Sequence, residues 1–218
     1  QQLGPEHPDT AASLNNLATF YRLQGRYSEA EPLYQRALAI FEQQLGPEHP
    51  DTARSLNNLA GLYRAQGKYE EAESLYRRAL VIWEQELGDS HPNTAMSLNN
   101  LALLYRAQGK YGEAELLYQR ALAIQEQELG DSHPDTATSL YNLAELYASQ
   151  GKYREAEVLF QRALIIHEQV LGPEHPDTVG TMWWLAVVSQ RQQYYQEAKR
   201  LYQRALAIYE RILGAEHS

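Results

Sequence analysis

Pairs of asparagines recur inside leucine-rich segments of this chain, and a carboxamide is suited to a particular kind of chemistry. The segment SLNNLA stands at 13–18, 55–60 and 97–102, and it becomes SLYNLA at 139–144 and TMWWLA at 181–186. A carboxamide carries both a hydrogen-bond donor and an acceptor. It can therefore pair with the N–H and C=O groups of an extended peptide, whatever side chains that peptide has. Asn is also a poor residue in a helix interior, so its recurrence there indicates a use beyond helix formation.

Arginines follow the amides further along the same segments, at Arg22, Arg64 and Arg106. A guanidinium group prefers carboxylates and can bind them through two parallel hydrogen bonds. The two sets of side chains predict a surface for an extended, acidic peptide, with Tyr141 and Trp183 to hold an apolar side chain of that peptide. The predicted peptide-binding residues are Asn15, Asn16, Asn57, Asn58, Arg64, Asn99, Asn100, Arg106, Tyr141, Asn142 and Trp183.

The elements that carry these side chains belong to an internal repeat. The dipeptide LG recurs every 42 residues without insertion, at 3–4, 45–46, 87–88, 129–130, 171–172 and 213–214. Such a period predicts a single repeat array over residues 1–218. Residues 213–218 restart the segment that joins the repeats, so we expect a piece of a longer protein. The predicted units are approximately 3–44, 45–86, 87–128, 129–170 and 171–212.

Each unit is predicted to form two helices. In the second unit Pro50 is compatible with a first helical turn, where its missing N–H would have no partner. That helix is expected to stop at Gly67, because glycine adopts left-handed conformations without a Cβ penalty. The next helix is predicted from about Tyr69 to Leu87. The connection is too short for anything except an antiparallel hairpin.

The second unit reads LNNLAGLYRAQGKYEEAESLYRRALVI from residue 56 and resembles the tetratricopeptide repeat. The matching positions are Leu56, Ala60, Tyr63, Gly67, Tyr69, Ala72, Tyr76 and Ala79. With its 42-residue period and the linker LGPEHPDTA, the chain resembles in particular the repeats of kinesin light chain, over essentially all of its length. The resemblance implies an all-α, right-handed solenoid of antiparallel helix pairs that acts as a non-catalytic protein–protein interaction module.

The resemblance also implies where the amides lie. A helical wheel at about 100° per residue places Leu17 and Ala18 against the second helix, Phe20 against a neighbouring unit, and both asparagines of a pair on the open side. In the resembled family the first helix lines a concave groove in which asparagines hold peptide backbones, and kinesin light chain binds acidic, tryptophan-containing peptides. This role carries over to the amide pairs of the first three units and to Asn142, and it stops at Trp183 and Trp184.

Two alternatives stay open for these residues and for the chain. The asparagines could instead bond to neighbouring units and stabilise the array, or recur only because the repeats arose by duplication. The array could be a structural spacer or a self-associating scaffold within a larger protein. Self-association would use the ends of the solenoid, where the last helix is expected to leave Leu201, Ala205 and Ile208 open to a neighbour.

Composition excludes several other functions. The formal net charge of −9 and the pI near 5.3 argue against a nucleic-acid binder, and no apolar run is long enough to cross a membrane. No cysteine is present, which excludes disulfides and thiolate chemistry and leaves the redox compartment undetermined. No motif of a common enzyme class occurs, so we expect no enzyme and no cofactor. We expect a cytoplasmic location. The once-per-unit histidines mark helix starts and not a metal site, and His167 is expected between helices. Tyr27 and its equivalents are expected to pack between the two helices of each unit.

Overall fold

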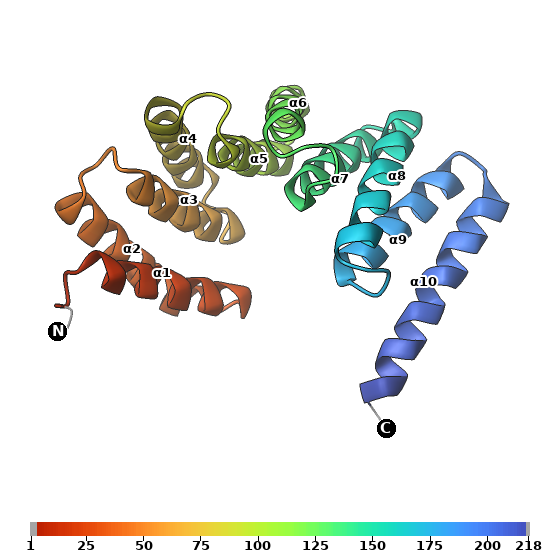
Figure 1. Ribbon diagram of the computed structural model, residues 1–218, viewed down its shortest axis with the longest axis horizontal. Coiled ribbons are helices and arrows are strands. Elements are labelled where there is room, and N and C mark those ends of the chain that lie inside the picture. Colours follow the sequence, from red (N-terminus) through yellow and green to blue (C-terminus); the bar gives the residue numbers. More distant parts are fainter. Residues whose placement is uncertain (1–3, 217–218) are drawn as a thin grey trace. The chain divides into compact units, whose positions relative to one another are not determined.

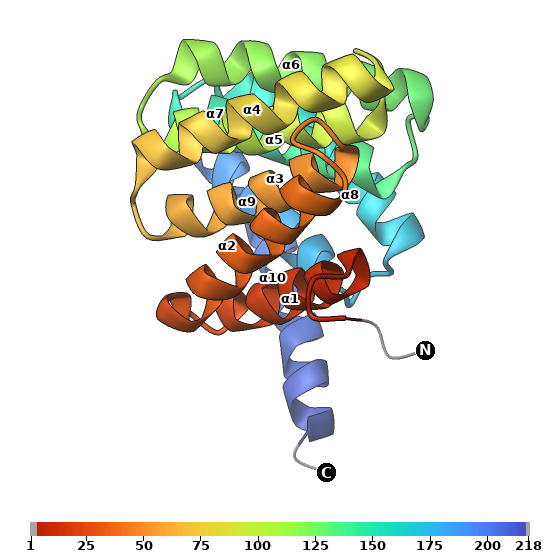
Figure 2. The same cartoon turned by 90° about the vertical axis from the view of Figure 1, so that its left-hand side faces the viewer.

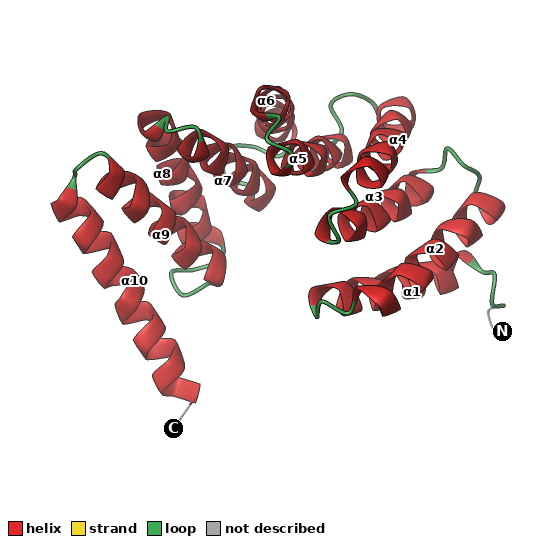
Figure 3. Cartoon of the chain, turned by 180° about the vertical axis from the view of Figure 1, so that it is seen from behind, coloured by secondary structure: helices red, strands yellow, loops and turns green. Residues whose placement is uncertain are grey.

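Residues 4–216 are described by a computed structural model, and they form ten α-helices and no strand over that range (Figure 1, Figure 3). The all-α prediction is therefore confirmed for this part of the chain. The helices are α1 Pro8–Leu23, α2 Tyr27–Gln44, α3 Pro50–Ala65, α4 Tyr69–Leu87, α5 Pro92–Ala107, α6 Tyr111–Glu128, α7 Pro134–Ser149, α8 Tyr153–Val170, α9 Pro176–Arg191 and α10 Tyr195–Glu216. The bounds of α3 and α4 agree with those expected from the sequence.

The chain divides into two compact units, residues 1–117 and 118–218. Within the first, α3 contacts α1 on one side and α5 on the other, whereas the described parts of α2 and α4 do not contact each other. Within the second, α7 contacts α9, and the described residues of α8 and α10 likewise do not meet. In each unit the first helices of the repeats are therefore more closely spaced, which places them on the concave side of that unit. Figure 2 shows the helices of the first unit stacked from α1 at the bottom to α4 near the top.

Each first helix begins with a histidine that caps its free N–H groups. In the second repeat His49 Nδ1 accepts a hydrogen bond from the Asp51 backbone N–H at 3.1 Å, and Pro50 occupies the first turn. The Thr52 hydroxyl donates to the Gly46 carbonyl oxygen at 2.8 Å and ties the helix start to the preceding linker. The same two bonds recur in every repeat. The prediction that these histidines mark helix starts is confirmed, and their side chains serve the backbone.

The turn between the two helices of a repeat requires a left-handed residue. Gly67 adopts φ +76° there, as expected from the sequence. In the fifth repeat the equivalent residue is Gln193, which adopts φ +67° although it has a Cβ atom. A left-handed residue other than glycine costs about 1–2 kcal/mol, so the last hairpin holds a less favourable turn than the others.

Small residues and one aromatic ring fill the space between the helices. In the first repeat Ala18, Ala30 and Tyr34 are fully buried, and Leu59 and Leu62 of the next first helix pack against them. The rings at the equivalent position of the next repeats, Tyr76, Tyr118 and Phe160, are fully buried as well. The helices α3 and α9 are thus each covered by their own second helix and by that of the preceding repeat, whereas α1 is covered only by its own.

One expectation about the core holds in some repeats only, and another is wrong. Tyr27 and Tyr153 are half-buried and pack against the apolar clusters, as expected, whereas their equivalents Tyr111 and Tyr195 are 40% and 62% exposed. Leu201, Ala205 and Ile208 are buried, because α10 turns them toward α9 and a shared apolar cluster. The apolar side chains that α10 leaves exposed are instead Leu206 and Tyr209.

Candidate functional site

The candidate site lies on the first helices of the repeats. In the first unit α1, α3 and α5 carry the asparagine pairs and the three arginines, and in the second unit α7 and α9 carry Tyr141, Asn142 and Trp183. All five helices lie on the concave side of their units. The expected position of the helices is therefore correct, while the orientation of individual side chains differs from the helical wheel.

The first asparagine of each pair is buried and not open to a ligand. Asn15, Asn57 and Asn99 are only 4%, 8% and 6% exposed. The Asn15 side-chain oxygen accepts a hydrogen bond from the Ser55 hydroxyl of the next repeat at 3.3 Å. The wheel misplaced these amides because it treated one repeat by itself, whereas the adjacent first helix covers this position. Their hydrogen bonds match the alternative in which the asparagines join neighbouring repeats.

The second asparagine of each pair is more accessible in the first unit. Asn16 is exposed, and Asn58 and Asn100 are half-buried. Asn100 donates from its side-chain nitrogen to the Asn57 oxygen at 3.1 Å, so one face of its amide is already engaged. In the second unit Asn142, at 8% exposed, is buried like the first amides. The accessible amide groups are therefore those of Asn16, Asn58 and Asn100.

Arg22 and Arg64 have no carboxylate partner among residues 4–216. Both are half-buried, and Arg64 Nε is fully covered without a hydrogen-bond partner among the described groups. They lie near the buried hydroxyl of Tyr76: burial raises the pKa of the Tyr76 phenol, and the Arg64 and Arg22 guanidinium groups oppose that rise. Two positive charges thus accompany one buried hydroxyl on the concave side.

Three arginines of the second helices, unlike Arg22 and Arg64, each form an ion pair with an acidic residue of the preceding repeat. Arg78 lies 2.7 Å from Glu42, Arg162 lies 2.7 Å from Glu126, and Arg204 lies 2.7 Å from Glu168. Arg22 and Arg64 on the concave side of the first unit therefore lack the carboxylate partners that these second-helix arginines have. Arg106 of α5 is also half-buried and occupies the equivalent position, but it has interactions of its own and is not counted with them.

In the second unit a row of aromatic rings replaces the amides. The Tyr141 ring meets Phe160 edge-on at 5.6 Å, Phe160 stacks on Trp184 at 6.0 Å, and Trp184 meets Trp183 edge-on at 5.1 Å, all between ring centroids. Trp184 and Tyr141 are half-buried, whereas 47% of Trp183 is exposed. Trp183 is therefore the ring that remains accessible to an apolar group of a ligand.

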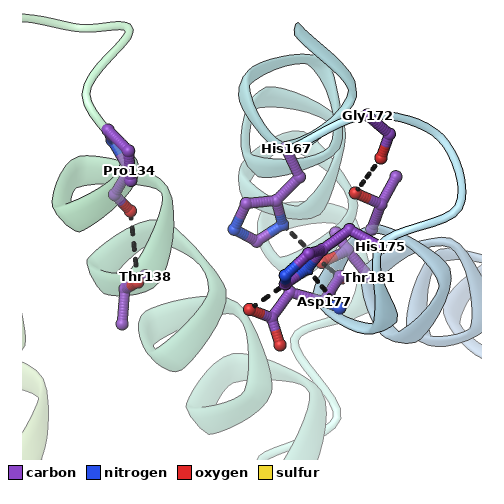
Figure 4. A network of polar contacts seen from close by, with 8 residues as sticks. Pro134, Thr138, His167, Gly172, His175, Asp177 and Thr181 are labelled. Atoms are coloured by element: carbon purple, nitrogen blue, oxygen red, sulfur yellow. Dashed lines mark hydrogen bonds and ion pairs between the residues drawn. The ribbon is translucent and has the colours of Figure 1, made fainter. Parts of the chain in front are cut away.

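His167 lies between helices, as expected from the sequence. It is 5% exposed, and its Nδ1 lies 3.0 Å from the Thr181 hydroxyl oxygen of the next repeat (Figure 4). Burial lowers the pKa of this imidazole, the negative charge of Asp177 opposes the shift, and His175 adds to it. His167 is therefore held in its neutral form.

Two other kinds of site receive no support. Over the described residues, no group of three or more His, Asp or Glu side chains could hold a metal ion. The same part of the chain contains no helix with the length and apolar character needed to cross a membrane.

Comparison with known proteins identifies the family. Models of the tetratricopeptide repeat match residues 9–80, 56–127, 136–177 and 185–218, which together cover most of the chain. The chain belongs to the tetratricopeptide repeat family. No curated protein matches it. The fold of this family is that of a protein–protein interaction or scaffold module, and the family is typically non-catalytic.

Solved tetratricopeptide structures support the closer resemblance to kinesin light chain. A protein of Podospora anserina, named for kinesin light chain and its nearly identical repeats, is 32% identical with a TM-score of 0.76, over 94% of this chain and 98% of its own. BtubC (BKLC) of P. vanneervenii is 27% identical with a TM-score of 0.82, over 95% of this chain and 82% of its own. The expected tetratricopeptide solenoid with kinesin-light-chain-like repeats is therefore confirmed.

The burial of the first asparagines gives a prediction about stability. Replacing Asn16 by Ala should leave the free energy of unfolding unchanged or raise it by a few tenths of a kcal/mol, because Ala is the better helix former. Replacing Asn57 by Ala should be less favourable than Asn16→Ala by about 1 kcal/mol, since it removes a bond between repeats. Urea unfolding of both variants measures the difference, and equal stabilities would show that the buried amide contributes nothing.

The neutral state of His167 gives a prediction about pH. The unfolded chain takes up a proton at the ordinary histidine pKa, about 6.5, whereas the folded chain resists it until a lower pH. The free energy of unfolding of the second unit should therefore fall as the pH drops below about 6.5. In His167→Gln this fall should be smaller. Tryptophan fluorescence reports on the second unit alone once Trp83, the tryptophan of the first unit, is replaced by Phe. Phe is the residue at the equivalent position of the first repeat, Phe41. Parallel pH curves for the two proteins would refute the assignment.

Proposed function

We propose that this tetratricopeptide array is a non-catalytic recognition module that binds an extended, acidic peptide along the first helices of its repeats. One observation carries the proposal: Arg22 and Arg64 on the concave side have no carboxylate partner among residues 4–216, while Arg78 and its equivalents on the second helices are paired. Partly buried guanidinium groups without a carboxylate partner are suited to a carboxylate ligand.

The amides have two roles in this proposal. The accessible ones, Asn16, Asn58 and Asn100, would hydrogen-bond the peptide backbone. The buried ones would act indirectly, because they fix the spacing of the helices that carry the arginines. These are Asn15, Asn57, Asn99 and, in the second unit, Asn142.

The expected energies call for an apolar anchor as well. Three backbone hydrogen bonds contribute about 0.5–1.5 kcal/mol each, and an exposed arginine–carboxylate pair adds about 0.2–1 kcal/mol. A micromolar complex needs about 8 kcal/mol after the peptide has been ordered. Trp183, with 47% of its surface exposed and its inner face supported by Trp184, is the proposed anchor, and Tyr141 lies in the same aromatic row. Arg106 would extend the acidic preference along α5.

The comparisons support this class of function. The similar solved structures from Podospora anserina carry the kinesin light chain name, and the family matched by the chain commonly serves protein–protein interaction. We propose a protein partner for this chain on that basis, with neither a nucleic acid nor a membrane as ligand.

The arginines provide the test. A fluorescein-labelled pool of extended peptides, rich in Asp and Glu and with one aromatic residue each, is titrated with the protein. The double variant Arg22→Gln/Arg64→Gln should bind the pool about two- to thirtyfold more weakly, the sum of two pairs at about 0.2–1 kcal/mol each. Added salt should weaken the wild type more than the variant.

A matched control separates a local effect from net charge. The double variant Arg78→Gln/Arg204→Gln removes the same two charges from the convex side, and it should bind the pool as the wild type does. If both double variants lose affinity equally, or if neither does, the proposed contact between the peptide and the concave arginines is wrong.

A second candidate function is a self-associating scaffold, and the exposed end faces favour it. Leu17 and Phe20 on α1 are 43% and 53% exposed, whereas the equivalent Leu59 and Leu62 of the second repeat are 4% and 0% exposed. On α10 Leu206 is 56% exposed, while its equivalent in the fourth repeat is covered. A second copy stacked end to end would cover both faces as neighbouring repeats do.

Light scattering over a range of concentrations tests the scaffold. The weight-average mass should rise with concentration, and the variant Phe20→Glu/Leu206→Glu should stay a monomer because a charge at either face opposes burial. A wild-type protein that remains monomeric at the highest concentration would exclude self-association and leave peptide recognition as the proposal.

A further inference from the structure

A cavity of about 280 Å³ lies in the second unit, where the fourth and fifth repeats meet. Tyr141 and Asn142 of α7 line one side, Asp177 and Gly180 of α9 line the other, and His167 of α8 lies at the back. Figure 4 shows the His167 ring and the Asp177 carboxylate on the side of α9 that faces α7. None of the arginines assigned to the acidic peptide lines this cavity.

One wall of the cavity has no side chain, at Gly180. The residue equivalent to Gly180 is an alanine, an arginine, a methionine and a threonine in the preceding repeats, at Ala12, Arg54, Met96 and Thr138. A Cβ atom added to Gly180 would meet nothing within 4 Å. A glycine in a helix interior costs about 1 kcal/mol relative to alanine, and no close approach of another group requires it here.

The back wall is also different in this repeat. The residue equivalent to His167 is a fully buried ring in the first two repeats, Phe41 and Trp83, each 1% exposed. His167 is as deeply placed but polar. The junction of the fourth and fifth repeats therefore combines an open space with a buried hydrogen-bonding group.

The hydrogen bonds around His167 fix which of its nitrogens carries the proton. The Thr181 hydroxyl donates to the Asp177 backbone carbonyl oxygen at 2.7 Å, so its hydrogen is engaged there. His167 Nδ1, 3.0 Å from the Thr181 oxygen, must then be the donor in that contact. In a neutral imidazole the other nitrogen, Nε2, is then an acceptor. Among residues 4–216 it has no hydrogen-bond partner, and it points toward α7 (Figure 4).

The remaining groups of the cavity define the charge that it favours. Asp177 contributes a carboxylate that is close enough to act on the His167 imidazole. The Tyr141 hydroxyl donates to Glu145 at 3.3 Å, so its own hydrogen is engaged outward and its ring forms part of the wall. A carboxylate ligand would meet a lone pair and a negative charge, and a purely apolar one would leave Nε2 unpaired.

We propose that this cavity is a subsite for a basic side chain, lysine or arginine, of a protein partner. The ammonium or guanidinium group donates to His167 Nε2 and lies beside the Asp177 carboxylate, while the aliphatic stem contacts the Tyr141 ring and the space above Gly180. The subsite adds a cationic requirement to a partner that is acidic elsewhere, and it does not depend on the arginines of the first unit.

Capped amino acids test the subsite directly. N-acetyl-lysine-N-methylamide and its norleucine analogue, which has the same stem without the charge, are titrated into the ¹⁵N-labelled chain and followed by NMR. The lysine probe should shift the His167 Nε2 resonance and the side-chain amide resonance of Asn142, which also lines the cavity, in a saturable manner. The norleucine probe should bind at least fivefold more weakly, if at all. Equal binding of the two probes, or no saturable shift with lysine, overturns the proposal.

Variants taken from the chain's own repeats provide the controls. Gly180→Met introduces the residue of the third repeat, fills the cavity without a helix penalty, and should abolish binding of the lysine probe. Asp177→Asn introduces the residue found at Asn93 and should weaken it about two- to fivefold, as expected for an exposed ion pair. Asp135→Asn makes the same change one repeat earlier, outside the cavity, and should leave binding unchanged. Equal losses at Asp177 and Asp135 would overturn the role of the cavity.

Two further outcomes separate this proposal from others. Arg22→Gln/Arg64→Gln should leave the affinity for the lysine probe unchanged, so failure of the acidic-peptide proposal and failure of the subsite can be told apart. Putrescine, a free diamine with no peptide groups, should bind no better than the lysine probe. If it binds more tightly, the cavity is a small-molecule site and the proposed protein partner is wrong.

Discussion

The contact between each first helix and the second helix of the preceding repeat is the constraint on which the rest of the structure depends. Leu59 and Leu62 are buried only because the helix pair of the first repeat covers them. Their equivalents on α1, Leu17 and Phe20, lack that cover and are exposed. This contact turns each first helix so that a narrow stripe remains open on the concave side. A side chain can take part in recognition only if it lies on that stripe, and the positions beside it are buried between neighbouring first helices whatever their polarity.

Within this fixed frame, one position of the second helix changes character from repeat to repeat. Phe41 and Trp83 fill the junction with the next repeat with apolar rings, whereas Gln125 and His167 place hydrogen-bonding groups at the same depth, 3% and 5% exposed. Each polar residue is hydrogen-bonded through one of its atoms to a hydroxyl of the following first helix, Gln125 to Ser139 in one junction and His167 to Thr181 in the other. A buried polar group that keeps its hydrogen bond is tolerated without large cost. The array can therefore vary its junctions chemically while the backbone repeat stays the same.

The sequence was sufficient to predict the fold because the repeat supplies the same local signals many times. The HP dipeptides, the glycines between helices and the 42-residue period all predict helix pairs, and α3 and α4 have the expected bounds. The site was predicted less well. A wheel drawn for one helix cannot show that Asn57 is covered by Asn100 of the next repeat, or that Leu201 faces α9. The unpaired state of Arg22 and Arg64 and the cavity beside Gly180 depend on distances between repeats, and no single-repeat pattern contains them.

The distribution of charge argues that the open stripe is a surface for recognition and more than a by-product of duplication. If the repeats reflected duplication alone, we would expect arginines on both sides of the array to form ion pairs to the same extent. Instead Arg78, Arg162 and Arg204 of the second helices each pair with a carboxylate of the preceding repeat, while Arg22 and Arg64 have no such partner in the described part of the chain. In the second unit the positions equivalent to Arg22 and Arg64 are Ala148 and Gln190, and Glu145 stands where the first unit has Thr19 and Gly61. The first helices of the first unit therefore carry guanidinium groups that those of the second unit lack, so the preference for a carboxylate ligand belongs to the first unit.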